Sequence, residues 1–120
     1  MKTHKDLEVW KQSIAFVTQL YQQTNSFPKE EIYGLTHQMR RAAVSIPSNI
    51  AEGSARNSNK EYIQFLYIAL GSWAELETQL TIAVNLDYIN STECNELKVQ
   101  LDEIGKMLNG LISYRKKLKS

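Results

Sequence analysis

Apolar residues recur at every third or fourth position in four long stretches of the chain, and they nowhere alternate for long enough to predict a strand. This spacing places side chains on one face of an α-helix. The four stretches cover residues 6–24, 30–54, 58–86 and 92–118, with short connections between them. We therefore predict an all-α protein of one domain over residues 1–120, an antiparallel up-down-up-down four-helix bundle.

The first and third stretches carry more apolar positions than one bundle core requires. Val9, Phe16 and Tyr67 have no obvious place inside a four-helix core, so they are candidate contacts with another copy of the chain. Surplus apolar surface often marks such a contact, and scattered exposure without a partner is the alternative. The inner stripe that we predict for the first helix is Leu7, Trp10, Ile14, Val17 and Tyr21.

Pro47 falls inside the second stretch, and the apolar stripe continues through it from Ala42 and Ile46 to Ile50. Proline has no backbone N–H to donate, and its ring presses on the preceding helical turn. A new helix that began at Pro47 would have Ile46 as its N-cap, which is a poor residue for that position. We therefore predict one helix that is kinked at Pro47.

The composition is that of an ordinary soluble protein, with 42% hydrophobic and 22% charged residues. The single cysteine, Cys94, cannot form an internal disulfide, which favours a reducing compartment. The N-terminus lacks the apolar segment of a signal peptide. The uncharged, largely apolar run of residues 62–74 is shorter than the roughly 20 residues that cross a bilayer. We expect a cytoplasmic protein with no membrane partner.

Residues that carry catalysis or bind metals are scattered through the chain. His4 and His37 are not placed beside a nucleophile, and Cys94 lies on the apolar stripe of the fourth helix, as a small buried hydrophobe does. No Glu-x-x-His pair of the kind found in metal-binding bundles occurs. The glycines are isolated and form no phosphate-binding loop. We expect no enzymatic activity, no catalytic or metal-binding residue and no cofactor.

Two adjacent arginines, Arg40 and Arg41, have two interpretations. If the connection between the second and third helices is centred near residue 57, both arginines lie level with Glu75 and Glu77 on the third helix. We predict that at least one of these arginines forms an ion pair with one of these glutamates. Exposure to a polyanion is the alternative.

The net charge of the chain is only +1, so any polyanion site requires local clustering or several copies of the chain. Positively charged residues cluster at the connection between the second and third helices and in the C-terminal tail. Cations at a helix C-terminus also complement the helix dipole, so the tail has both a structural and a ligand-binding interpretation. The candidate nucleic-acid contacts are Arg40, Arg41, Arg56, Lys60, Arg115, Lys116, Lys117 and Lys119.

Three segments resemble the bacterial four-helix-bundle family, also called the 23S rRNA intervening-sequence protein family. They are LEVWKQSI at residues 7–14, YGLTHQMRRAAVSIPSNIAEGSAR at residues 33–56, and EYIQFLYIALGSWAELETQL at residues 61–80. The resemblance is specific in the second and third helices and weak in the fourth. Trp73 stands where a small residue is expected and Ala55 where glycine is expected, which affects local packing and leaves the fold intact.

The resemblance implies that relatives are four-helix bundles that assemble as homopentameric rings, and that some are encoded within intervening sequences of ribosomal RNA genes. A related protein, the accessory variability determinant of diversity-generating retroelements, presents a basic surface and binds nucleic acid and a reverse transcriptase. We therefore expect a non-catalytic homo-oligomer, a homopentamer by resemblance, whose partner is RNA, DNA, a reverse transcriptase or another protein. A purely structural or scaffolding homo-oligomer with protein partners alone is the alternative.

Overall fold

The computed structural model describes residues 2–118, which form four long helices and no strand. Two short 3₁₀ helices precede the first and second of them. None of the described helices combines the length and the hydrophobicity that crossing a bilayer requires. The predicted all-α, four-helix fold is confirmed. The elements in chain order are η1 (His4–Asp6), α1 (Glu8–Thr24), η2 (Lys29–Glu31), α2 (Leu35–Ser54), α3 (Asn59–Asn85) and α4 (Ser91–Lys117).

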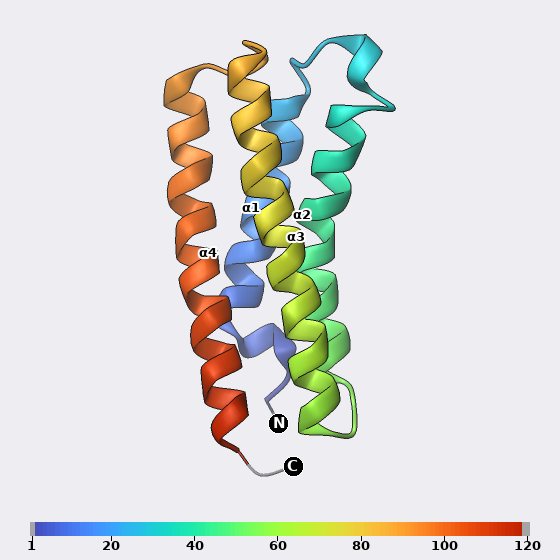
Figure 1. Ribbon diagram of the computed structural model, residues 1–120, viewed down its shortest axis with the longest axis vertical. Coiled ribbons are helices and arrows are strands. Elements are labelled where there is room, and N and C mark those ends of the chain that lie inside the picture. Colours follow the sequence, from blue (N-terminus) through green and yellow to red (C-terminus); the bar gives the residue numbers. More distant parts are fainter. Residues whose placement is uncertain (1, 119–120) are drawn as a thin grey trace.

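The four helices lie side by side along the long axis of the molecule, and consecutive helices run in opposite directions (Figure 1). The molecule measures 47 × 25 × 23 Å. The N-terminal segment, the α2–α3 turn and the end of α4 lie together at one end of the bundle. The α1–α2 and α3–α4 connections lie at the opposite end. Each end is therefore built from segments that are distant in sequence.

The core-facing side of α1 differs from the predicted one. Val9, Phe16 and Leu20 are 4%, 1% and 0% exposed, whereas Ile14 and Tyr21 are both 41% exposed. The prediction that Val9 and Phe16 contact another chain is therefore wrong, because both side chains fill the core of their own bundle. Two apolar stripes run along α1, and a periodic pattern alone does not determine which of them faces inward. The third candidate, Tyr67 on α3, is 44% exposed.

The second long helix begins later than predicted, at Leu35, after the separate turn η2. The Glu31 carboxylate accepts the backbone N–H of Leu35 through Oε1 at 3.0 Å. Its Oε2 accepts the Tyr88 hydroxyl at 2.7 Å, which connects this turn to the segment after α3. Helix α2 then continues through Pro47 to Ser54. The kink at Pro47 stays a prediction.

Helices α3 and α4 begin at side-chain caps. Ser58 Oγ accepts the backbone N–H of Glu61 at 3.1 Å, and Asn90 Oδ1 accepts that of Glu93 at 2.8 Å. Such caps supply acceptors for N–H groups that the first helical turn leaves without partners, and each stabilises a helix by about 1 kcal/mol. The Ser58 cap defines where the α2–α3 turn ends. Cys94 follows in the first turn of α4 and is buried in the core, as predicted.

Candidate functional site

The N-terminal segment, the α2–α3 turn and the end of α4 meet at one end of the bundle (Figure 1). Positive charge is concentrated in these three segments. We define this basic end as residues 2–8, 52–62 and 112–118, which contain seven Lys and Arg against four Asp and Glu. The opposite end, residues 24–34 and 84–96, contains one Lys against five Asp and Glu. The net charge of +1 therefore conceals a strong separation of charge along the bundle, and the basic end attracts anions locally.

The structure brings together the two basic clusters that lie far apart in sequence. Asn59, beside the α2–α3 turn, donates its Nδ2 to the Arg115 carbonyl at 2.6 Å. Arg115 Nε in turn donates to Asn59 Oδ1 at 2.7 Å. These two hydrogen bonds hold the end of α4 against the start of α3. Five of the eight predicted contacts lie at this basic end, and Lys119 lies outside the described residues; the five are Arg56, Lys60, Arg115, Lys116 and Lys117.

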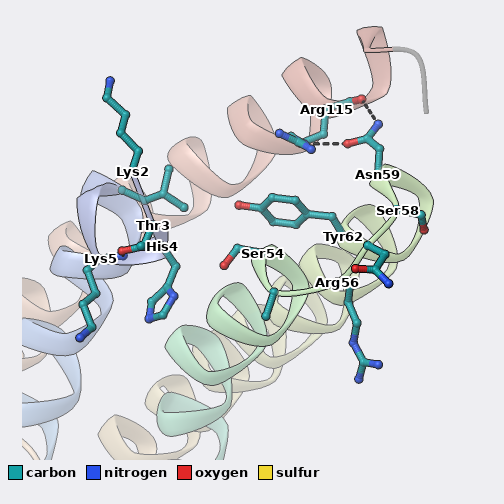
Figure 2. Close-up of a pocket in the computed structure, with 13 residues that line it drawn as sticks. Lys2, Thr3, His4, Lys5, Ser54, Arg56, Ser58, Asn59, Tyr62 and Arg115 are labelled. Carbon is teal, nitrogen blue, oxygen red and sulfur yellow. Dashed lines mark hydrogen bonds between the residues drawn. The ribbon is translucent and has the colours of Figure 1, made fainter.

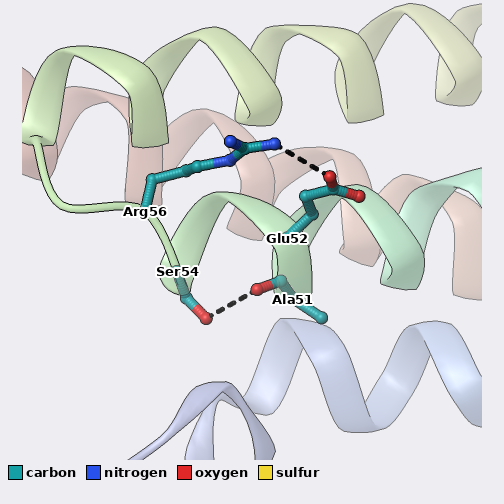
Figure 3. Close-up of polar contacts among 4 residues, drawn as sticks. All are labelled: Ala51, Glu52, Ser54 and Arg56. Carbon is teal, nitrogen blue, oxygen red and sulfur yellow. Dashed lines mark hydrogen bonds and ion pairs between the residues drawn. The ribbon is translucent and has the colours of Figure 1, made fainter.

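Arg56, in the α2–α3 turn, is partly neutralised by Glu52 near the end of α2. Its Nη2 lies 2.9 Å from Glu52 Oε1, and both side chains are largely exposed (Figure 3). Its guanidinium also lies 4.7 Å from the centre of the Phe65 ring. Nearby, Ser54 Oγ donates to the Ala51 carbonyl at 3.0 Å, which completes the last turn of α2. Because of the Glu52 carboxylate, Arg56 contributes less to the positive field than Lys60 and Lys117 do.

Arg40 has a structural role that the sequence did not predict. Its Nε donates to Thr24 Oγ1 at 3.0 Å, and its Nη2 donates to the Tyr21 carbonyl and to Asn25 Oδ1, both at 3.2 Å. Its guanidinium lies 4.5 Å from the centre of the Tyr21 ring. Arg40 thus fastens α2 to the C-terminal end of α1 and is half-buried there.

The predicted ion pairs of Arg40 or Arg41 with Glu75 or Glu77 are not formed. Within residues 2–118, the one ion pair shorter than 4.0 Å joins Arg56 to Glu52. Arg41 and Glu75 line the same shallow hollow, but their charged atoms do not meet. The helices have the expected register, yet the direction of each side chain decides the contact. Arg41 lies about 20 Å along α2 from Ser54, so neither arginine belongs to the basic end.

A pocket of about 710 Å³ opens at the basic end between η1, the α2–α3 turn and α4 (Figure 2). Four of its lining residues are Lys or Arg, and none is Asp or Glu. Its floor includes Tyr62, which is only 8% exposed, and the Arg115 guanidinium lies 4.5 Å from the centre of the Tyr62 ring. Burial raises the pKa of the Tyr62 hydroxyl, and the charge of Arg115 opposes this rise. The phenol is therefore protonated at neutral pH.

The position of Tyr62 depends on a close approach of α2 to α3. A Cβ atom placed on Gly53 would lie 2.8 Å from Phe65 Cβ and 3.1 Å from Tyr62 Cδ1. Only glycine leaves room for the α3 side chains at this position. The residue therefore allows the two helices to meet tightly next to the pocket.

Sequence reasoning missed the N-terminal side of this pocket. Lys5 in η1 and Lys2 just before it are among the residues that line the pocket. A capping box closes η1: Thr3 Oγ1 accepts from the Lys5 N–H at 3.2 Å, and the Thr3 N–H donates to Asp6 Oδ2 at 2.7 Å. The pattern of a threonine followed three residues later by an acidic residue is a known sign of such a turn. That signal identifies an ordered N-terminal turn, but only the folded chain places it opposite Arg115.

A second surface feature is an apolar face formed by α1 and α2. Two adjoining hollows of about 310 and 570 Å³ lie on this face, and Val44 lines both. Contiguous exposed apolar side chains can mark a contact surface between proteins. We call it the α1–α2 apolar face. The buried Pro47 also lines it, and its exposed or half-buried members are Trp10, Ile14, Val17, Tyr21, Ile32, Tyr33 and Val44.

The family model described as "23S rRNA-intervening sequence protein" matches residues 5–110. The chain belongs to this family. A crystal structure from Bacteroides thetaiotaomicron, of a protein with unknown function from the S23 ribosomal protein family, has a similar fold. It superposes with a TM-score of 0.80 at 24% identity, over 88% of this chain and 95% of that chain. A search of curated proteins found no match. In this member of the family, Arg115, Lys116 and Lys117 lie beyond the matched residues.

Proposed function

We propose that this protein is a non-catalytic, homo-oligomeric module that binds RNA or DNA through its basic end. The observation that carries this proposal is the separation of charge along the bundle, with seven Lys and Arg in the segments of one end and one in those of the other. Membership of the 23S rRNA-intervening sequence protein family also supports a role with nucleic acid.

The side chains at the basic end suit contacts with phosphate groups. Lys60 and Lys117 are exposed and have no carboxylate within 4.0 Å in the described part of the chain. Lys116 lies over the exposed Tyr67 ring, with its Nζ 5.1 Å from the ring centre. Exposed ammonium groups displace counterions from a nucleic-acid backbone without reading its sequence. The expected binding is therefore sensitive to salt and weakly dependent on sequence.

Self-association strengthens the proposal because it repeats the basic end. The α1–α2 apolar face supplies surface for contact with a second copy, and the family resemblance implies a ring of five. In a closed ring each copy presents the same charges about one axis, so a modest cluster produces a larger local field. The homopentamer is part of this proposal.

The nucleic-acid proposal is tested by fluorescence anisotropy with a labelled single-stranded RNA of about 20 nucleotides at several salt concentrations. We expect affinity to fall steeply as salt rises, with a slope of about −0.7 per phosphate contact. The double variant Lys60→Glu with Lys117→Glu is expected to bind at least about tenfold more weakly at low salt. The matched control reverses two exposed lysines elsewhere on α4, Lys98→Glu with Lys106→Glu, and is expected to lose less affinity.

The oligomer is tested by sedimentation velocity. Val44→Asp places a charge on the α1–α2 apolar face and is expected to reduce the assembly to a smaller species. Val99→Asp, on an exposed site of α4, is expected to leave the assembly unchanged. If wild-type protein binds no nucleic acid at low salt but remains a stable oligomer, the scaffolding function with protein partners replaces the proposed one.

A further inference from the structure

We propose that the pocket at the basic end binds the dianionic phosphate of a phosphate monoester, with Arg115 and Tyr62 as its principal contacts. This site is distinct from the exposed lysines of the proposed nucleic-acid surface, because it is an open recess lined by Arg115 and by Tyr62, whose ring is largely buried. The proposal stands on the geometry of the pocket and does not require oligomerisation.

The Tyr62 hydroxyl is the first observation that supports a ligand. The residue is 8% exposed, yet its hydroxyl has no hydrogen-bond partner within residues 2–118. Figure 2 shows the oxygen pointing across the pocket toward Thr3 and His4 on the opposite wall. The ring is largely buried, but the hydroxyl oxygen is open to the pocket, so a bound anionic oxygen can accept its hydrogen bond in place of water. As a protonated phenol, it offers a donor to an anionic oxygen.

The Arg115 guanidinium is the second observation that supports a ligand. Its Nε is occupied by Asn59 and its face lies over the Tyr62 ring, so the group is held in place. Its two terminal nitrogens have no hydrogen-bond partner in the described part of the chain and lie beside the pocket (Figure 2). A fixed guanidinium with available N–H groups matches the geometry of a phosphate group.

The surroundings favour an anion. No Asp or Glu lines the pocket, and Lys2 and Lys5 lie on the side opposite Arg115, with their side chains extending away from the Tyr62 hydroxyl (Figure 2). The negative end of the α4 dipole lies nearby, but Asn59 donates to the Arg115 carbonyl and offsets it there. A phosphate monoester carries about 1.5 to 2 negative charges at neutral pH, which suits the Arg115 guanidinium in a pocket without carboxylates.

The volume indicates that the phosphate is attached to an organic group. A volume of about 710 Å³ lies within the range of about 300–1,000 Å³ that is typical of pockets for small organic ligands and cofactors. Leu7 and Ala55 supply apolar lining beside the polar groups. Two sources present the same chemistry: a free mononucleotide and the 5′-phosphorylated end of an RNA strand.

The test uses the full-length protein and isothermal titration calorimetry with four probes. Adenosine 5′-monophosphate is compared with adenosine, and a short RNA with a 5′-phosphate is compared with the same RNA bearing a 5′-hydroxyl. The proposal requires a clear preference for the phosphorylated member in at least one pair. Preference in the first pair identifies a free nucleotide as the source, and preference in the second pair alone identifies an RNA end. Equal binding, or no binding, within both pairs overturns the proposal.

Conservative variants then locate the site. Tyr62→Phe removes only the hydroxyl and is expected to weaken binding of the preferred probe by about 3- to 10-fold, and Arg115→Lys by about 10-fold or more. Tyr114 is an exposed tyrosine in the same region, and Tyr114→Phe is expected to leave the affinity for the preferred probe unchanged. Equal affinity of Tyr62→Phe and wild type would place the phosphate elsewhere and overturn the assignment. Binding of the 5′-hydroxyl RNA reports separately on the proposed nucleic-acid function.

Discussion

The indole ring of Trp73 in α3 lies directly against the backbone of Gly105 in α4. A Cβ atom placed on Gly105 would lie 2.6 Å from Trp73 Cζ2 and 2.7 Å from Cε2. The Trp73 Nε1–H donates to the Leu101 carbonyl at 2.6 Å, so the ring is held in this position. Gly105 therefore provides the space that allows a tryptophan to stand where the family resemblance leads one to expect a small residue.

We expect Gly105→Ala to destabilise the protein by about 1–3 kcal/mol, because the new methyl group overlaps a ring that cannot turn away without losing its hydrogen bond. The free energy of unfolding in urea measures this effect. Gly110→Ala is the matched control, since Gly110 lies in the same helix with no atom near the position of a new Cβ. That variant is expected to gain about 0.5–1 kcal/mol from the higher helix propensity of alanine. Equal effects at the two positions would contradict the packing described for Trp73.

Adjacent arginines on α2 are expected to differ sharply in their contribution to stability. Arg40→Ala removes three hydrogen bonds to the C-terminal end of α1 and the contact with the Tyr21 ring, with an expected cost of about 1–3 kcal/mol. Arg41→Ala is expected to change stability by less than about 0.5 kcal/mol, because Arg41 is exposed and has no such partners within the described residues. Thermal unfolding of the two variants compares them directly, and similar losses would show that Arg41 has a contact that the structure lacks.

Glu31 is expected to make the stability of the fold sensitive to acid. The backbone N–H of Leu35, and then the Tyr88 hydroxyl, hold the pKa of this carboxyl below its ordinary value of 4.5. Because the pKa is lower in the folded state than in the unfolded state, the contribution is complete above about pH 4.5 and is lost as the pH falls through the folded pKa. We expect wild-type protein to lose more unfolding free energy than Glu31→Gln between neutral pH and pH 3.

Urea unfolding at a series of pH values measures this difference for Glu31. Glu30→Gln is the control, because Glu30 is a neighbouring exposed carboxylate that accepts no hydrogen bond within residues 2–118. Its acid dependence is expected to follow that of the wild type. If Glu31→Gln and wild type lose stability in parallel, the hydrogen bonds of Glu31 do not stabilise its charged form.

Sequence alone determined the helical class, the number of helices and the burial of Cys94. These follow from the recurrence of apolar residues at every third or fourth position, which is a local property and does not depend on what the helix packs against. The family was likewise recognisable from short segments of the first three helices. The same spacing did not determine which stripe of α1 faces inward, because Val9 and Phe16 belong to one apolar stripe and Ile14 and Tyr21 to its neighbour.

Tertiary structure alone decided the chemistry of the surface. Arg41 lies level with Glu75, as the helix register predicts, but the directions of the two side chains keep their charged atoms apart. The Arg40 side chain is directed instead toward the C-terminal end of α1. The basic end exists because antiparallel packing gathers three distant segments at one end of the bundle, which a net charge of +1 conceals. Helices depend on neighbours along the chain, so the sequence was enough to predict them. Ion pairs and pockets depend on distances of a few ångströms between residues that are remote in sequence, so only the folded molecule determines them.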